Sequence, residues 1–339
     1  MGQGPVLLVT GATGLVMSHV VRGWLERNPG GQAVAVDLAP PGPVVGEFFA
    51  PVADRLHPRI GDVRHDRLWR AVEEDFAVTH AVHGAVVTSI NRLTRRDDGP
   101  ADLGGALPAL ETNILGTLRA LAWAARQPGL RRFVTVSSGS VYAAEGPSPL
   151  PEDGHVEPDG LYGISKYTGE LYTAEAARRF GLPALSVRLS GVYGPLDRDT
   201  GVRDVTSVPG TLLRAALAGE EIGLAGLDVA GDYIHAGDVA AAIAALLDCA
   251  EPRHAVYNVA YGEAVSLRAL AERVAHLVPG ARWREAPPAE ADLALDPVPL
   301  GGRWGAYDIS RLAADCGWRP RPLDQALADY RDWLTEQPY

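Results

Sequence analysis

Cysteine is scarce in this chain of 339 residues, which has only two, Cys249 and Cys316. They lie far apart in the sequence and have no spacing typical of metal ligands. Small secreted proteins that depend on disulfides have many more cysteines, and zinc sites group theirs. We therefore expect two free or buried thiols, no metal site, and a reducing, cytoplasmic location.

Long apolar segments are also missing. The sequence has no run of the roughly 18 apolar residues that a membrane-spanning helix requires. The few residues before Val6 lead directly into an apolar segment, so we expect no signal peptide and no membrane span.

Basic residues do not predominate either. Lysine and arginine together number 31 against 42 acidic residues, which gives a net charge of −11. This balance argues against nucleic acid or an anionic membrane as the main partner. We also find no internal repeat, coiled-coil heptads or low-complexity tail. With 47% hydrophobic residues, the chain has enough apolar side chains for a full core.

A strand, a glycine turn and a helix are indicated at the start of the chain. Residues 6–10 are apolar without polar alternation, which is typical of a strand buried on both faces. Gly11 and Gly14 follow, and residues 18–25 have helical spacing. This arrangement directs backbone N–H groups and the positive end of a helix at a phosphate. The third glycine position of such turns is Met17 here, and we expect it to weaken cofactor binding relative to glycine.

An acid ends the next apolar segment. Residues 33–36 predict a second strand, and Asp37 follows it about 20 residues beyond the turn, where dinucleotide sites place a carboxylate on the ribose hydroxyls. A carboxylate repels a 2′-phosphate, and residues 38–40 contain no arginine to hold one. The pattern favours NAD over NADP. The alternative is a solvated acid that closes a strand.

Buried strands and helices alternate along the first half of the chain. This alternation indicates an α/β fold, a Rossmann-like, doubly wound parallel sheet. Further strands are predicted over residues 59–63, 80–87, 132–137 and 184–189, and helices over 68–72, 110–126 and 162–180. Residues 90–105 are polar and glycine-rich, which predicts a loop over the site.

The loops lengthen beyond about residue 190, where only the helices 238–249 and 267–278 are clear. We expect residues 1–189 to form a dinucleotide-binding Rossmann domain that includes the catalytic residues. Residues 190–339 then form mainly a smaller, loop-rich substrate-binding lobe, with some segments returning to the core sheet. Open α/β sheets bind ligands in the crevice at the carboxyl ends of their strands.

Two further segments carry residues suited to proton transfer. Tyr162 and Lys166 are four residues apart, hence on one face of a helix. Free tyrosine titrates near pH ~10, too high for a base at neutral pH, and a neighbouring cation lowers the pKa of a phenol. Residues 137–142 contain three serines at the end of a predicted strand, where a hydroxyl could hold a substrate oxygen. Either segment alone also fits a helix surface or a polar strand end.

Together, these segments resemble the extended short-chain dehydrogenase/reductase family, often called NAD-dependent epimerase/dehydratases. The resemblance covers nearly the whole chain. Its motifs are the turn at 10–16, Asp37, Asp62-Val63, His83-Gly84-Ala85, 112–117, 137–142, 162–170, 232–240, and the C-terminal run from Asp308 to Pro320.

The resemblance implies a role for each matched residue. Ser138 positions the substrate oxygen, Tyr162 is the acid/base, and Lys166 binds the nicotinamide ribose and tunes Tyr162. Asn113 braces the site, and the helices carrying Asn113 and Tyr162 form the dimer interface in most relatives, so we expect a homodimer. The residues expected to contact NAD are Gly11, Thr13, Gly14, Leu15, Val16, Asp37, Asp62, Val63, Gly84, Ala85, Val86, Asn113, Tyr162, Lys166, Leu189 and Val192.

Four positions depart from the nucleotide-sugar and dehydratase members of that family. Ser190 replaces a common Asn and Gly231 a common Arg, and both of those side chains contact the substrate diphosphate there. Losing an Arg forfeits charge-assisted hydrogen bonds worth about 1.5–3 kcal/mol each. Gly139-Ser140 stands where dehydratase relatives have Asp-Glu, which argues against a 4,6-dehydratase. The arginines available as substitutes are Arg188, Arg198, Arg203 and Arg214.

We therefore expect an NAD-dependent dehydrogenase or ketoreductase acting on a secondary alcohol or ketone of a small polar, sugar-like or hydroxy-acid substrate. The alternatives are a nucleotide-sugar epimerase, similar to UDP-glucose 4-epimerase, with tightly bound NAD, and a binding relative that has lost catalysis. The residues expected to contact the substrate are Thr88, Ser89, Asn91, Ser138, Ser140 and Ser190. Arg92, Arg95 and Arg96 fit either a carboxylate site or a solvated loop.

Overall fold

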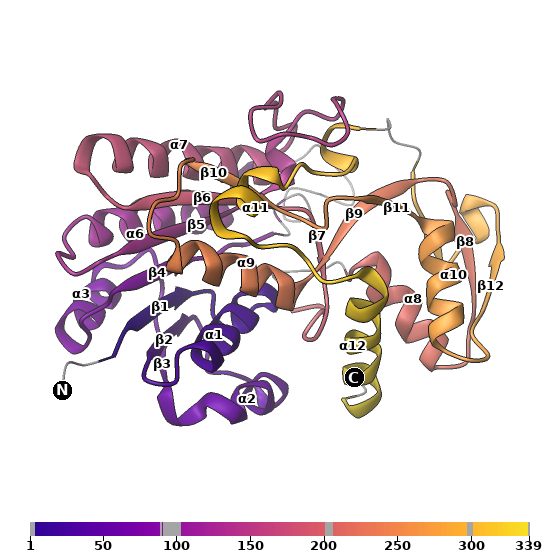
Figure 1. Cartoon of the computed structure of the whole chain (residues 1–339), viewed down its shortest axis with the longest axis horizontal. Helices are drawn as coiled ribbons and strands as arrows, with labels where there is room; N and C mark the ends of the chain where they lie inside the picture. The colour runs from indigo at the N-terminus through magenta and orange to yellow at the C-terminus, as the bar shows by residue number, and fades with distance from the viewer. Residues whose placement is uncertain (1–3, 89, 91–102, 201–205, 297–300, 338–339) are drawn as a thin grey trace.

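A seven-stranded sheet forms the centre of the computed structural model, which describes residues 4–88, 90, 103–200, 206–296 and 301–337 (Figure 1). The strand order is β10-β6-β5-β4-β1-β2-β3, and all neighbouring pairs are parallel. This confirms the doubly wound α/β fold. The strands are β1 (Val6–Thr10), β2 (Gln32–Asp37), β3 (Leu56–Ile60), β4 (His80–His83), β5 (Arg132–Ser138), β6 (Ala184–Leu189) and β10 (Val256–Val259).

Helices cover both faces of this sheet, as the unbroken apolar strands require. In β1, Leu7 and Val9 pack into one layer, whereas Val6 and Leu8 pack into the other. One layer contains α1 (Leu15–Arg27), α2 (Pro43–Phe49) and α9 (Ala236–Asp248), and the other contains α3 (Asp66–Asp75), α6 (Gly116–Ala124) and α7 (Leu161–Phe180).

Several predicted boundaries were wrong. The strand predicted over 59–63 is β3, which ends at Ile60, and the strand predicted over 80–87 ends at His83. The loop predicted over 90–105 is wrong at its end, because α5 (Leu103–Leu110) begins there, and residues 91–102 lie outside the described residues. Its glycines, Gly104 and Gly105, lie within this helix, although each costs about 1 kcal/mol there relative to alanine. A π-helix, Glu111–Leu115, joins α5 to α6.

A second, smaller part follows β6, with strands β7 (Gly191–Tyr193), β9 (Ala230–His235) and β11 (Ala264–Ser266) in one sheet. A further sheet contains β8 (Glu221–Ala225), β12 (Arg282–Glu285) and β13 (Leu293–Ala294). Its helices are α8 (Val208–Leu217), α10 (Leu267–Leu277) and α12 (Leu323–Glu336), whereas α11 (Ser310–Cys316) packs against β10 and α9. Among the described residues, the short 3₁₀ turns are η1 (Ala50–Arg55), η3 (Gly139–Val141), η4 (Pro288–Glu290) and η5 (Gly302–Trp304).

The sequence analysis missed α8, α11 and α12. In α8, Pro209 and Gly210 suggested a loop, but this proline lies in the first helical turn, where its lack of an N–H costs nothing. Ser207 caps the helix, and its hydroxyl accepts the N–H of Gly210 at 3.1 Å. Three segments after residue 190 return to the first part: β10 joins the main sheet, α9 packs along α1, and α11 packs against β10 and α9. In the described part of the chain, no helix combines the length and apolar character needed to cross a membrane.

Candidate active site

The turn between β1 and α1 has the geometry of an anion site. Gly11 has φ +71°, and a Cβ there would lie 2.9 Å from the backbone nitrogen of Ala85, so only glycine fits. Gly14 is the N-cap of α1, and no side chain of the described residues caps this helix. The first amide groups of α1, at Leu15 and Val16, therefore have no acceptor within the helix, and the turn fits a pyrophosphate.

The carboxylate of Asp37 is fixed beside this turn at the end of β2. Its Oδ2 accepts the backbone N–H of Thr13 at 2.9 Å and the Thr13 hydroxyl at 2.7 Å, and Oδ1 accepts the N–H of Leu38 at 2.8 Å. No cation of the described residues forms an ion pair with it. An acid without a cation beside it fits a ribose with free hydroxyls, as in NAD, and disfavours an added phosphate.

Asp62 and Val63 follow β3, but the carboxylate of Asp62 is already engaged. Arg64 lies 2.7 Å from it and also pairs with Glu111 at 3.0 Å, and its hydrogen bonds lower the pKa of Asp62. Val63 is buried, and Gly116 of α6 packs so closely that a Cβ there would lie 2.7 Å from the Val63 side chain. The sequence pattern did not reveal the arginine partner.

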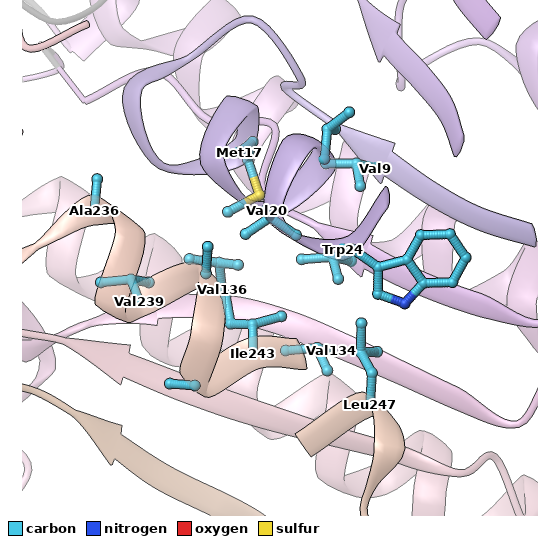
Figure 2. Close-up of a cluster of buried hydrophobic side chains, with 14 of the residues drawn as sticks. Val9, Met17, Val20, Trp24, Val134, Val136, Ala236, Val239, Ile243 and Leu247 are labelled. Carbon is cyan, nitrogen blue, oxygen red and sulfur yellow. The ribbon is translucent and has the colours of Figure 1, made fainter. Parts of the chain in front are cut away.

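Met17, in place of the third glycine, points into the core. Only 3% of its surface is exposed, and Figure 2 shows it among the buried side chains of α1 and α9. A Cβ on Gly84 would lie within 2.5 Å of Met17 Cγ, so the missing side chain at 84 makes room for the methionine. The methionine is therefore accommodated beside β4 and faces away from solvent.

Ser138 and Tyr162 come from two elements that pack against each other, η3 and α7. Ser138 ends β5 and caps η3; its hydroxyl accepts the N–H of Ser140 at 3.2 Å and donates to the Ser140 hydroxyl at 3.1 Å. Tyr162 lies in the first turn of α7. At Gly163 a Cβ would lie 3.0 Å from Pro158 and closer still to the Ser140 carbonyl, so this glycine permits the approach.

The ammonium group of Lys166 lies beneath Tyr162. Its Nζ donates to the carbonyl of Val136 at 2.8 Å and lies 5.8 Å from the centre of the Tyr162 ring. Burial lowers the pKa of Lys166 to about 8, although the charge of Glu170 opposes the shift. The helical spacing predicted from the sequence thus places a partly buried cation beside a phenol.

Asn113 connects α7 with the segment after β4. Its Oδ1 accepts the N–H of Val87 at 2.9 Å, and its Nδ2 donates to the Val87 carbonyl at 3.1 Å and to the Ser165 hydroxyl at 3.2 Å. The residue lies in the π-helix, a local irregularity often found at functional sites. A bracing role for Asn113 is consistent with these contacts.

A buried ion pair that the sequence analysis missed lies behind these residues. Arg188 of β6 contacts Glu170 of α7 at 2.7 Å, each with a side chain only 4% exposed, and Glu170 also accepts the hydroxyl of Ser137 at 2.5 Å. Arg188 therefore does not belong among the arginines available to a substrate. Nothing in the local sequence pattern pairs Arg188 with Glu170, which lie 18 residues apart on different elements.

The other predicted substrate and cofactor residues are dispersed. The Ser190 hydroxyl donates to Asp232 of β9 at 2.7 Å, and Asp232 also accepts three backbone N–H groups. The Ser190 hydroxyl is therefore engaged in holding β9 in place. At Gly231 a Cβ would lie 2.9 Å from the Tyr233 hydroxyl. Thr88 and Val86 follow β4, Leu189 ends β6 and Val192 lies in β7. Ser89, Asn91, Arg92, Arg95, Arg96 and Arg203 lie outside the described residues.

Comparisons with known proteins give one consistent result. The model of the family "NAD dependent epimerase/dehydratase family" matches residues 7–260. A dTDP-glucose 4,6-dehydratase from Streptomyces niveus is 31% identical over 56% of this chain and 54% of its own length. A UDP-glucose 4-epimerase from Mycolicibacterium smegmatis is 29% identical over 93% of both chains. The chain spans only about half the length of some other relatives. The match covers 47% of a trifunctional UDP-glucose 4,6-dehydratase from Arabidopsis thaliana and 57% of a dTDP-4-dehydro-6-deoxyglucose reductase from Escherichia coli.

The same fold is found in solved structures. A UDP-glucose 4-epimerase from Bifidobacterium longum, solved in complex with NAD+ and UDP, has a TM-score of 0.76 and 18% identity, and the match covers 98% of this chain and 99% of that one. Identity this low supports the fold alone.

Proposed function

The chain belongs to the NAD-dependent epimerase/dehydratase family, and from that premise we propose that it moves a hydride between NAD and a secondary alcohol or ketone of a small polar, sugar-like or hydroxy-acid substrate. The observation that carries this proposal is the partly buried ammonium of Lys166, 5.8 Å from the ring of Tyr162. A phenol beside a partly buried cation is suited to exchange a proton with a substrate hydroxyl.

The residues that would hold NAD are the β1–α1 turn, Asp37 and Lys166. When bound, NAD accepts or donates the hydride. Tyr162 takes the proton from the substrate hydroxyl as the carbonyl forms, and returns it in the reverse direction. Ser138 donates or accepts a hydrogen bond at the same oxygen, because its hydroxyl lies at the end of β5 where η3 meets α7. The Lys166 ammonium favours the phenolate form of Tyr162.

Nucleotide-sugar epimerisation is the second candidate, because the similarity to the M. smegmatis epimerase extends over 93% of both chains. An epimerase returns the hydride to the opposite face of its substrate and recycles NAD without releasing it. A dehydrogenase must exchange NAD at every turnover.

This difference provides the first experiment: mass spectrometry of nucleotides released when the purified protein is denatured. Near-stoichiometric NAD, especially with a nucleotide sugar, favours the epimerase. A protein that arrives empty and binds added NAD reversibly favours the dehydrogenase.

A variant tests the proton-transfer role in either case. Turnover is followed with UDP-galactose for epimerisation, and with D-galactose and D-glucuronate plus NAD for oxidation. Tyr162→Phe retains the ring and removes the hydroxyl, and we expect it to lower kcat at least 100-fold, the low end of what a positioned acid/base contributes (~10²–10⁴). Tyr172→Phe, on an exposed position of the same helix, is the control. Unchanged activity in Tyr162→Phe would exclude the proposed role.

We also propose a homodimer through the helices that carry Asn113 and Tyr162. Large apolar side chains are exposed there: Leu103, Leu107, Leu115, Ile164, Leu171 and Tyr172. Burying such a patch favours association. Sedimentation velocity is expected to give a dimer that Leu171→Glu dissociates, whereas Phe180→Glu, at the end of α7, does not. A cytoplasmic location is part of the proposal, supported by Cys249 and Cys316 being free thiols.

A further inference from the structure

A C-terminal segment far from the catalytic motifs lies against the turn that carries Ser138. We call residues 301–308 the strap. Its backbone is hydrogen-bonded to the loop after η3: Gly302 N–H donates to the Pro147 carbonyl and Arg303 N–H to the Ala143 carbonyl, each at 3.2 Å. Because these contacts are made by the backbone, the path of the strap is set along that loop.

Tyr307 fills the space left by the glycine next to Ser138. A Cβ on Gly139 would lie 2.6 Å from Tyr307 Cζ and closer still to its hydroxyl oxygen, where no atom fits. Tyr307 is only 3% exposed, and its ring meets that of Tyr142 edge to face at 5.7 Å. The phenol thus fits against the backbone of residues 138–140, which we call the serine turn.

Tyr307 is itself anchored at both ends. Its hydroxyl donates to the carbonyl of Arg303 at 3.0 Å, and its backbone N–H donates to Asp232 of β9 at 3.2 Å. Since the side chain cannot move away without breaking these bonds, it limits the positions that Gly139, and with it Ser138, can take.

The strap also contacts the loop that leads into α7, the helix that carries Tyr162. Arg303 donates two hydrogen bonds to Asp159, at 2.7 and 2.5 Å, and these lower the pKa of the Asp159 carboxyl. Asp159 lies three residues before Tyr162. One short segment therefore touches the turn at Gly139 and the loop that leads into α7.

We infer that Tyr307 and Arg303 are positioning residues, which hold the serine turn and the first turn of α7 in place. In this arrangement the hydroxyls of Ser138 and Tyr162 reach the same substrate oxygen. The inference rests on the proposed function. Small displacements of reacting groups, of about 1 Å, lower rates by large factors, so a fixed relation between the two elements matters for the rate of hydride transfer.

A double-mutant cycle between Gly139 and Tyr307 tests this inference. Gly139→Ala should lower kcat at least 100-fold, because its methyl group displaces the turn from Tyr307. In a Tyr307→Ala background the same substitution should cost less than threefold, because the opposing ring is gone. Gly129→Ala is the matched control, since a Cβ there meets nothing within 4 Å. Equal losses in both backgrounds, or full activity of Gly139→Ala, would overturn the inference.

The kinetics also separate positioning from lost stability. Turnover is measured with whichever of UDP-galactose, D-galactose and D-glucuronate the wild-type chain converts, and with the same compound deuterated at the reacting carbon. A displaced serine turn slows hydride transfer, so the isotope effect on kcat should rise in Gly139→Ala while the dissociation constant for NAD stays within twofold. Partial unfolding lowers the active fraction and leaves the isotope effect unchanged. Arg303→Gln, a milder variant, should lower kcat about three- to tenfold and should also raise the isotope effect on kcat. If the isotope effect rises in neither Gly139→Ala nor Arg303→Gln, the inference is overturned.

Failure of the inference and failure of the proposed function give different results. If Ser138→Ala and Tyr162→Phe remain active, the proposed function is wrong. If they are inactive while Gly139→Ala is like wild type, only the positioning role is wrong. Should none of the three compounds react, amide hydrogen exchange decides: Gly139→Ala should speed exchange in residues 137–143 and 159–166, and Tyr307→Ala should relieve that effect. Unchanged exchange refutes the role of the strap.

Discussion

Replacing Arg188 with methionine is expected to destabilise the protein strongly without changing substrate affinity. The guanidinium donates to Glu170 from Nε at 2.9 Å and from Nη2 at 2.7 Å, and to the carbonyl of Glu152 at 2.9 Å. It also lies 4.5 Å from the centre of the Tyr142 ring. Burial alone would lower the pKa of Arg188, but the hydrogen bonds and charge of Glu170 raise it, so the ion pair stays charged.

The expected loss of unfolding free energy follows from the contacts that Glu170 keeps in Arg188→Met. Methionine keeps an apolar stem of similar length but leaves the Glu170 carboxylate buried with Ser137 as its remaining strong donor. Removing one partner of a buried pair costs about 3–5 kcal/mol, a large part of a total stability of about 5–15 kcal/mol. In the double variant Arg188→Met/Glu170→Gln, neither member of the pair is charged. We expect its loss of unfolding free energy to fall below about 2 kcal/mol, since a neutral side chain has no ionic desolvation cost.

Urea unfolding followed by tryptophan fluorescence measures these free energies, and steady-state kinetics with the same variants measures KM. Arg178→Met, which breaks an exposed pair with Glu175 at the surface of α7, is the control and should cost less than about 1 kcal/mol. The reasoning is refuted if Arg188→Met loses no more than this control. It is also refuted if the stability is unchanged and KM rises tenfold, which would return Arg188 to the substrate site.

Three further predictions concern the cofactor site and its lysine. Gly11→Ala should weaken NAD binding at least tenfold in titration calorimetry, because φ +71° and the approach of Ala85 exclude a side chain, whereas Gly30→Ala, which meets nothing within 4 Å, should bind normally. Met17→Gly should bind NAD more tightly than wild type but lose about 2–5 kcal/mol of unfolding free energy through the cavity beside Gly84; equal dissociation constants would show that Met17 only packs. The pKa of Lys166 is lowered to about 8 by burial, so the folded state releases this proton more readily than the unfolded chain. The free energy of unfolding of wild type should therefore rise relative to Lys166→Met as the pH increases from about 8 to about 10, and a difference independent of pH contradicts this.

Most of the fold could be predicted from the sequence because its information is local. Four of the seven main-sheet strands, β1, β2, β5 and β6, were placed within one residue at each end, since unbroken apolar segments between glycine-containing turns are typical of buried parallel strands. The helix predicted over 162–180 is α7, which begins at Leu161 and ends at Phe180. The errors in α5 and α8 fall where glycine and proline lie inside a helix, because the same residues also mark loops.

The sequence by itself determined the alternation of strands and helices, the glycine turn between β1 and α1, and the shared helix face of Tyr162 and Lys166. Each of these depends on neighbours within a few residues, through backbone conformation and helical periodicity. The tertiary structure alone decided that Arg188 pairs with Glu170, that Met17 occupies the space above Gly84, and that Tyr307 fits against Gly139. Those pairs join residues that are distant in the chain, and their chemistry exists only once the layers pack and exclude water.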